Sequence, residues 1–336
     1  MPGILEGLKV IDMGQVVAIP AAGAMMADWG AEVIKLEPLT GEFYRGLVRI
    51  QGVGLGEVKW NIQVLNRNKR GLALNLKTDA GRDILYKLIR TADVFMSNYK
   101  LDSINRFKID YATLSQINPK IIYCFLSGYG MKGPEKDERG FDFSAAWARS
   151  GMMYLIGEPL PKQDRTKAGN PIWNSYRTKD DRWFWLAMLQ GDAYWPDFCK
   201  AIERPELEKD PQFESIEMRT RNCEELIRTL DEVLASRTME EWEKRFKEHN
   251  CIVGRVASLE EVINDPQALV NDFFAEVEDY PAEKVKLVAT PVNFHQNPGS
   301  VRAPAPEVGQ NTEEILLELG YTWEDIASLK EQGVIL

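Results

Sequence analysis

The feature that most constrains the fold is the alternation of short apolar segments with helical segments between residues 8 and 130. Residues 8–13 (LKVIDM) are predicted to form a buried strand because apolar and β-branched residues follow one another there. Residues 20–31 (PAAGAMMADWGA) read as a small-residue helix that Gly30 stops, and residues 32–37 (EVIKLE) as a second strand. A crossover this short and tight favours parallel pairing of the two strands.

The same alternation continues further along this half of the chain. Strands are predicted at residues 68–76, 93–98 and 120–130, and helices at 79–92 and 111–118. Thr78 and Asp79 are expected to cap the first of these helices. The pattern predicts an α/β fold in which helices cover both faces of a parallel sheet.

The second half of the chain has a different pattern. Its predicted elements are a helix at 139–157, a strand at 182–189, a helix at 192–207, two amphipathic helices within 218–250 that divide near Ser236, a helical pair at 258–278, a strand at 284–294, and a helical tail with Thr312 and Thr322 as N-caps. An aromatic set is predicted to pack in a core rather than to bind a ligand: Trp183, Trp185, Tyr194, Trp195 and Phe198.

Composition excludes several classes of function. The net charge of -10 argues against nucleic-acid binding as the main role. The four cysteines form no C-x-x-C pair, which predicts free thiols in a reducing compartment. The only histidines, His249 and His295, make a metal site or a serine–histidine–aspartate triad a poor hypothesis. With no signal peptide and no apolar run of membrane-spanning length, we expect a cytoplasmic protein that contacts no membrane.

Ligands of doubly wound sheets bind at the carboxyl ends of the strands. Residues 14–18, 97–100 and 127–130 lie at those ends, but no G-x-G-x-x-G and no P-loop motif is present. The basic positions of residues 66–70, with Lys77 and Arg106, fit either a solvated surface or a groove for a phosphorylated small ligand.

Arg139 and Asp142 are three positions apart in the predicted helix at 139–157. They fit either a surface ion pair or a carboxylate at the mouth of a pocket. The residues alone leave both interpretations open.

Five blocks, in order and covering most of the chain, resemble the class III CoA-transferases. This is the formyl-CoA and carnitine-type family, to which the alpha-methylacyl-CoA racemases are related. The blocks are residues 5–38, 66–100, 117–159, 170–202 and 305–326.

The resemblance implies both architecture and chemistry. It implies a Rossmann-like large domain at 1–175, a smaller α/β domain at 176–295, a helical segment at 296–336 that returns to the large domain, and an interlocked homodimer. An aspartate of such enzymes attacks the thioester of an acyl-CoA and forms a mixed anhydride. CoA then returns to make an enzyme-linked thioester, and an acceptor carboxylic acid takes the CoA away. No metal takes part.

The resemblance also assigns site residues. The cleft for coenzyme A or acyl-CoA would use Gln15, Val16, Val17, Ala18, Leu74, Lys77, Asn98, Tyr99, Arg106 and Arg139. Asp142 falls where some relatives carry an accessory acidic residue. Pro38 departs from the family, in which many members have a basic residue that contacts a phosphate.

The largest departure lies between residues 157–159 (GEP) and 170–176 (NPIWNSY). In the family a G-D-x-x-[TS] stretch with the nucleophilic aspartate follows the GEP turn, and a long helical segment follows that stretch. Here the two motifs nearly meet, so the nucleophile is absent through an internal deletion near residues 160–170. Asp164 is the only carboxylate left in this joint, and we expect it to be a solvated loop residue. The missing helices would also help to form the interlocked dimer, so their absence counts against that dimer in this chain.

Three functions follow from these residues. The first is a CoA-transferase that moves CoA from an acyl-CoA to a free carboxylic acid, with its activity in question. The second is a non-catalytic CoA-binding remnant. An acyl-CoA racemase ranks last, because Phe141 stands where a racemase has its histidine. The amino-acid sequence of residues 170–189 most resembles that of transferases that act on aryl-, 2-hydroxy-acyl- or bile-acid-CoA.

Overall fold

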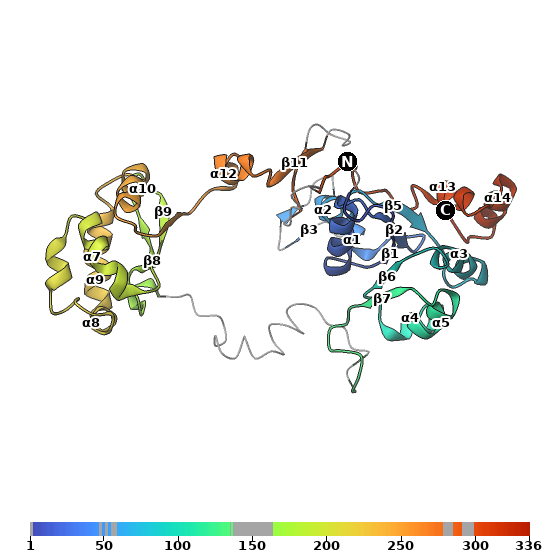
Figure 1. The fold of residues 1–336 in the computed structure, drawn as a ribbon, viewed down its shortest axis with the longest axis horizontal. Coiled ribbons are helices and arrows are strands. Elements are labelled where there is room, and N and C mark those ends of the chain that lie inside the picture. The colour runs from blue at the N-terminus through green and yellow to red at the C-terminus, as the bar shows by residue number, and fades with distance from the viewer. Residues whose placement is uncertain are drawn as a thin grey trace. The chain divides into compact units, whose positions relative to one another are not determined.

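The computed structural model describes residues 3–46, 49–50, 53–54, 59–134, 136, 164–277, 285–290 and 299–336. The chain divides into two compact units (Figure 1). Unit 1 comprises Met1–Met152 and Asp265–Leu336, and unit 2 comprises Met153–Asn264. Each unit is described by itself. The predicted helix at 139–157 lies outside the described residues.

Unit 1 is built on a five-stranded parallel sheet with the order β5-β2-β1-β6-β7. Its strands are β1 (Lys9–Met13), β2 (Glu32–Glu37), β5 (Arg70–Ala73), β6 (Val94–Ser97) and β7 (Ile122–Phe125). The predicted parallel sheet is therefore confirmed. The sheet grows from β1 towards β5 on one side and then from β6 towards β7 on the other, so its topological switch point lies between β1 and β6.

Alternate residues of the strands enter two separate cores, as expected when helices cover both faces. Ile11 and Ile34 join the larger core, whereas Val10 and Val33 join a smaller core that contains Ile19 of α1. The helices of the N-terminal part are α1 (Ala18–Asp28), α2 (Trp60–Asn66), α3 (Asp79–Ile89), α4 (Leu101–Phe107) and α5 (Tyr111–Ile117). The predicted Thr78 cap of α3 is confirmed, since its side chain accepts a hydrogen bond from the Gly81 amide.

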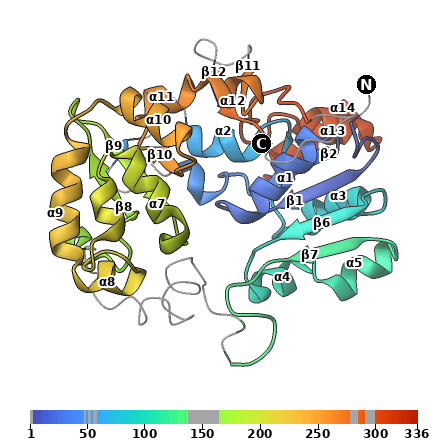
Figure 2. The same ribbon diagram turned by 60° about the vertical axis from the view of Figure 1, so that its left-hand side comes forward.

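The C-terminal helices α13 (Thr312–Glu318) and α14 (Trp323–Glu331) pack into the larger core of unit 1, and both views show them beside it in red (Figures 1 and 2). Thr322 caps α14 as predicted. The predicted cap at Thr312 is wrong, because α13 begins one residue earlier, with Asn311 as its N-cap. The Thr312 hydroxyl instead accepts a hydrogen bond from the Ala73 amide of the edge strand β5.

Unit 1 also contains short elements outside the main sheet. They are the 3₁₀ turn η1 (Phe43–Gly46), the hairpins β3 (Arg49–Ile50)–β4 (Val53–Gly54) and β11 (Phe274–Val277)–β12 (Val285–Val288), and α12 (Pro266–Val270). The helical pair predicted at 258–278 is wrong at its end. Phe274–Val277 instead form a strand that pairs antiparallel with β12, from Phe274 opposite Val288 to Val277 opposite Val285, so their backbone groups are bound across the ladder.

Unit 2 packs helices on a three-stranded antiparallel sheet of order β10-β9-β8. Its elements are η3 (Arg165–Lys167), β8 (Trp173–Arg177), β9 (Trp183–Ala187), α7 (Gly191–Ala201), η4 (Pro205–Lys209), α8 (Ile216–Arg221), α9 (Cys223–Leu234), α10 (Met239–Glu248), β10 (Val253–Arg255) and α11 (Leu259–Ile263). The predicted division near Ser236 is confirmed, although a further break at Asn222 makes α8 a separate helix.

The aromatic set divides between the two sides of this unit. Trp195 and Phe198 lie in its core as predicted. Trp183 and Trp185 do not, because they point to the outer face of β9, where they are 40% and 36% exposed. All four cysteines are free thiols. Throughout the described parts of both units, no helix is long and apolar enough to cross a membrane.

Candidate functional site

The candidate site lies at the carboxyl ends of β1 and β6, at the switch point of the sheet. Gln15 follows β1 and Asn98 follows β6, and the Asn98 side-chain amide makes two hydrogen bonds with the Gln15 backbone, of 2.8 Å to its N–H and 2.9 Å to its carbonyl oxygen. The Tyr99 hydroxyl lies close to the Gln15 side chain, which partly opposes the rise in the pKa of Tyr99 that burial causes. Three residues predicted for the CoA cleft are therefore in contact with one another.

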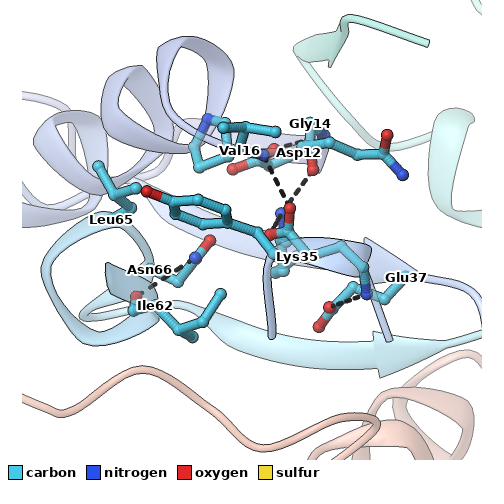
Figure 3. Close-up of polar contacts among 12 residues, drawn as sticks. Asp12, Gly14, Val16, Lys35, Glu37, Ile62, Leu65 and Asn66 are labelled. Carbon is cyan, nitrogen blue, oxygen red and sulfur yellow. Dashed lines mark hydrogen bonds and ion pairs between the residues drawn. The ribbon is translucent and has the colours of Figure 1, made fainter. Parts of the chain in front are cut away.

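The turn Gly14–Val16 is held by side chains at every step. Asp12 Oδ1 accepts the Gly14 N–H at 2.8 Å, and Lys35 Nζ donates to the Gly14 carbonyl at 2.6 Å. Glu42 Oε2 accepts the Val16 N–H at 2.8 Å. Figure 3 shows Gly14 and Val16 of the turn together with Asp12 and Lys35. With the Asn98 bonds to Gln15, five successive backbone groups are bound by buried or half-buried side chains.

Val16 has a backbone conformation that explains this close support. Its φ of 64° lies in the left-handed region. A β-branched residue is a real outlier there, and such strain, about 1–3 kcal/mol, persists only where the surroundings over-determine the conformation. The four side chains that bind the turn hold Val16 in this conformation.

Beneath the turn, Asp12 and Lys69 form a buried ion pair of 2.6 Å in which both side chains are 0% exposed. The Lys69 ammonium also lies within 2.9 Å of the carbonyl oxygens of Pro20 and Leu65 and of the Asn66 side-chain oxygen. Four oxygens thus surround three N–H groups, which is what a lysine needs in order to stay charged away from water.

A second set of buried charges lies beside this pair. Lys35 Nζ is 2.9 Å from Glu42 Oε1. The Glu42 N–H donates to Glu37, whose carboxylate receives a two-pronged ion pair from Arg45 at 2.7 and 2.8 Å. Because Asp12 and Lys35 are direct partners in the β1–β2 register, the two sets of charges meet on one face of the sheet.

The charges shift one another's pKa values. Burial would raise the pKa of Asp12, but Lys69 and Lys35 outweigh it and hold that pKa below its usual range. Burial lowers the pKa of Lys69 to about 8, against the opposing pull of Asp12 and with some help from Lys35. At Tyr99, burial raises the pKa of the hydroxyl well above its ordinary value. At neutral pH the turn is therefore bound by an ionised Asp12, with Lys69 mostly protonated and Tyr99 neutral.

Neither interpretation of the basic run at 66–70 is correct for its charged members. Arg67 is buried against Asp28 at 2.7 Å, and Lys69 against Asp12. Arg70 pairs with Glu314 and Glu318 of α13, at 3.0 and 2.7 Å. These cations neutralise carboxylates of unit 1 itself, because α2 packs against α1 and β5 lies beside α13. They form neither a solvated face nor a phosphate groove.

The remaining predicted cleft residues are less closely connected. Val17 and Ala18 are exposed at the start of α1, and Lys77 and Arg106 are exposed on the surface of unit 1. The Leu74 side chain is 1% exposed within the larger core, so only its backbone could face a ligand. Arg139 and Asp142 lie outside the described residues.

Asp164, the one carboxylate of the joint, is an exposed cap of a short turn. Its side chain accepts hydrogen bonds from the Thr166 N–H at 3.1 Å and hydroxyl at 2.6 Å. These bonds, led by that of the Thr166 side chain, lower its pKa. The predicted solvated loop residue is confirmed. Within the part of the chain that the structure describes, no group of three or more histidine, cysteine, aspartate or glutamate side chains is arranged to hold a metal.

Sequence reasoning missed the buried charges, although a signal was present. Asp12, Lys35 and Glu37 each occupy a strand predicted to be buried on both faces, and the period of two places all three on the same face. Because isolated charges are too costly to bury, such residues require partners. The cations at Lys69 and Arg45 were available to pair with them.

Gly23 of α1 is packed directly on the Asp12–Lys69 pair. A Cβ atom at this position would lie 2.5 Å from Asp12 Oδ2 and 3.1 Å from Lys69 Nζ. We expect Gly23→Ala to lower the free energy of unfolding by about 1–3 kcal/mol, although alanine normally favours a helix. Urea unfolding measures this change, with Gly46→Ala as the control because its added Cβ has open space. Equal stability of the two variants would show that the pair can shift freely.

The chain matches the sequence model of CoA-transferase family III over residues 5–167 and 160–312. It therefore belongs to that family. It is 28% identical to the (R)-2-hydroxy-4-methylpentanoate CoA-transferase of Clostridioides difficile over 396 aligned positions, which cover 99% of both chains. It is 26% identical to the cinnamoyl-CoA:phenyllactate CoA-transferase of Clostridium sporogenes over 401 positions, which cover 99% of this chain and 97% of that one.

The fold is similar to that of a CAIB/BAIF family protein from Brucella suis. The two structures superpose with a TM-score of 0.76 at 22% identity, over 95% of this chain and 100% of the other. The predicted α/β class and the family fold are both confirmed.

Proposed function

We propose that this chain binds CoA thioesters at the carboxyl ends of β1 and β6 and that it derives from enzymes that move CoA from an acyl-CoA to a free carboxylic acid. The observation that carries the proposal is the family match across both halves of the chain. The contact between Gln15 and Asn98 supports it, because ligands of such sheets bind at the switch point.

We further propose that the chain lacks the segment with the family's nucleophilic aspartate and so retains binding without exchange. Two observations support this. The family model matches in two pieces that meet at residues 160–167, inside the joint. The alignment with the Clostridioides difficile relative spans 396 positions although this chain has 336 residues, so at least 60 positions of the alignment have no residue of this chain.

The missing segment matters because the proposed chemistry needs a carboxylate at the thioester. In the complete enzyme, a carboxylate oxygen attacks the thioester carbonyl carbon, the carbon–sulfur bond breaks, and CoA leaves as a thiolate. The thiolate then attacks the enzyme's own carbonyl in the mixed anhydride, which releases the first acid and leaves an enzyme thioester. The acceptor carboxylate attacks the carbonyl carbon of the enzyme thioester, which releases CoA thiolate and forms a second mixed anhydride. The thiolate then attacks the acceptor's carbonyl carbon in that anhydride, which gives the new acyl-CoA and frees the enzyme carboxylate.

The proposed acyl class is a 2-hydroxy acid or an aryl-substituted acid. This proposal is supported by two relatives to which the chain is similar over nearly its whole length. One is named for (R)-2-hydroxy-4-methylpentanoate, and the other for cinnamoyl-CoA and phenyllactate. The cytoplasmic location, the interlocked homodimer and the domain limits at residues 175 and 295 stay predictions.

An exchange assay tests the proposal. The protein is given cinnamoyl-CoA with phenyllactate, and separately 2-hydroxy-4-methylpentanoyl-CoA with a second acid, and new acyl-CoA is followed by chromatography. We expect no exchange above the protein-free background, while calorimetry detects CoA binding. Measurable exchange would mean that another carboxylate acts as the nucleophile, and Asp142→Asn and Asp164→Asn would then be compared. Absence of CoA binding would contradict the proposed function itself.

A further inference from the structure

We propose that Glu42 is a positioning residue for the CoA site, which holds the Gly14–Val16 turn in the shape that the ligand needs. The proposal rests on the proposed function, because it takes this turn to be part of the CoA cleft. It adds a residue that lies outside the predicted cleft set and that acts through the backbone of Val16.

The first step of the argument is the place of Glu42 in the turn's support. Its carboxylate divides between two partners, with Oε2 accepting the Val16 N–H at 2.8 Å and Oε1 lying 2.9 Å from Lys35 Nζ. Lys35 in turn binds the Gly14 carbonyl at 2.6 Å. Glu42 and Lys35 therefore bind the two ends of the turn, and the ion pair between them fixes both side chains.

The second step is that Val16 needs this support. The left-handed φ of 64° is unfavourable for valine, and the Val16 N–H has Glu42 as its acceptor. Without that acceptor the residue is free to return to an extended or right-handed conformation, which would re-aim Gln15 on one side and the exposed Val17 on the other. Asn98 binds the carbonyl oxygen of the same Gln15–Val16 peptide, but it makes no bond to the Val16 N–H, whose acceptor is Glu42.

The third step is that Glu42 is itself rigidly placed. It is 2% exposed, and its own N–H donates to Glu37 Oε1 at 3.0 Å. Because Arg45 holds the Glu37 carboxylate through two hydrogen bonds, the position of Glu42 is determined by the charge set on β2 and η1. The turn after β1 is thus pre-organised from the neighbouring strand, which lowers the ordering cost of ligand binding.

The test compares CoA affinity in four forms of the full chain by titration calorimetry. Glu42→Ala removes the acceptor and is expected to weaken CoA binding about tenfold, the change that follows when the competent turn falls to about one tenth of the population. Glu42→Gln keeps an acceptor oxygen for the Val16 N–H and is expected to stay within about threefold of the unmodified protein.

The matched control is Asp28→Ala, which removes another buried carboxylate of unit 1. Asp28 pairs with Arg67 at 2.7 Å at the other end of α1, and its carboxylate binds Arg67 and Asn68 rather than the turn. Hydrogen exchange at the Val16 amide gives a second readout, and we expect faster exchange in Glu42→Ala than in Asp28→Ala even where the two are equally stable.

The outcomes separate the two proposals. If the unmodified protein binds CoA and Glu42→Ala binds equally well, or if Asp28→Ala loses as much affinity as Glu42→Ala, the positioning role is overturned and the proposed function stands. If the unmodified protein does not bind CoA, the proposed function fails and the positioning role fails with it. Loss in Glu42→Ala, with recovery in Glu42→Gln, supports both.

Discussion

Asp12→Ala is expected to lower the free energy of unfolding of unit 1 by about 3–5 kcal/mol, the usual cost of leaving one partner of a buried ion pair uncompensated. The variant strands Lys69 at 0% exposure, beside a second buried cation at Lys35, and also removes the acceptor of the Gly14 N–H. Burial already lowers the pKa of Lys69 to about 8, although the attraction of Asp12 raises it. Without Asp12 the pKa of Lys69 would fall further, so we expect Lys69 to become neutral at physiological pH.

The measurement is urea unfolding followed by hydrogen-exchange mass spectrometry on peptides from residues 3–46. Tryptophan fluorescence is less suitable because it combines signals from both units: five of the nine tryptophans lie in unit 2, namely Trp173, Trp183, Trp185, Trp195 and Trp242. The control is Glu313→Ala, which breaks an exposed ion pair with Lys330 and should cost less than about 1 kcal/mol.

A double variant separates the pair from its surroundings. Asp12→Ala with Lys69→Met removes both charges and should cost less than the sum of the two single changes, by roughly 1–3 kcal/mol. It should not restore full stability, because the Gly14 N–H still lacks its acceptor. Additive costs, or a loss in Asp12→Ala no greater than that in Glu313→Ala, would show that water reaches the pair.

The sequence predicted the parallel sheet of unit 1 because its strands and helices are regular and local. Runs of apolar β-branched residues and the helix cap at Thr78 depend on only a few neighbouring residues. Short crossovers then restrict neighbouring strands to parallel pairing through right-handed connections. Strand β8 was missed for the opposite reason. Trp173–Arg177 contains polar residues and follows the joint, and it becomes a strand only by pairing with β9.

The candidate site could be predicted in part. The positions of Gln15 and Asn98 follow from the rule on strand ends, and the structure brings them together. The contributions of Glu42 and Lys69 do not follow from that rule. Glu42 binds the Val16 N–H of the turn, and Lys69 binds the Asp12 carboxylate beneath it, from segments that no local pattern connects to the turn. Pairing of buried charges is a tertiary property.

Insertion of the segment that we propose to be missing is expected to convert the proposed CoA binder into an active transferase. The aligned positions of the Clostridioides difficile enzyme that have no residue of this chain would be placed between Pro159 and Asn170. Because loss of a covalent nucleophile commonly costs several orders of magnitude in rate, we expect exchange to rise roughly 10³-fold or more above the unmodified chain. The measurement is the chromatographic exchange assay with 2-hydroxy-4-methylpentanoyl-CoA as the donor.

Two matched forms make the result specific to the nucleophile. The same insertion, with asparagine in place of the aspartate that the family resemblance assigns as the nucleophile, should bind CoA and exchange no faster than the unmodified chain. The reverse deletion, made in the Clostridioides difficile enzyme, should abolish exchange and keep CoA binding, so the idea is tested even if the chimera does not fold. Exchange by the asparagine form at the rate of the aspartate form would place the nucleophile elsewhere in this chain. A deleted relative that remains active would show that the segment is dispensable, and the loss of activity proposed for this chain would then be wrong.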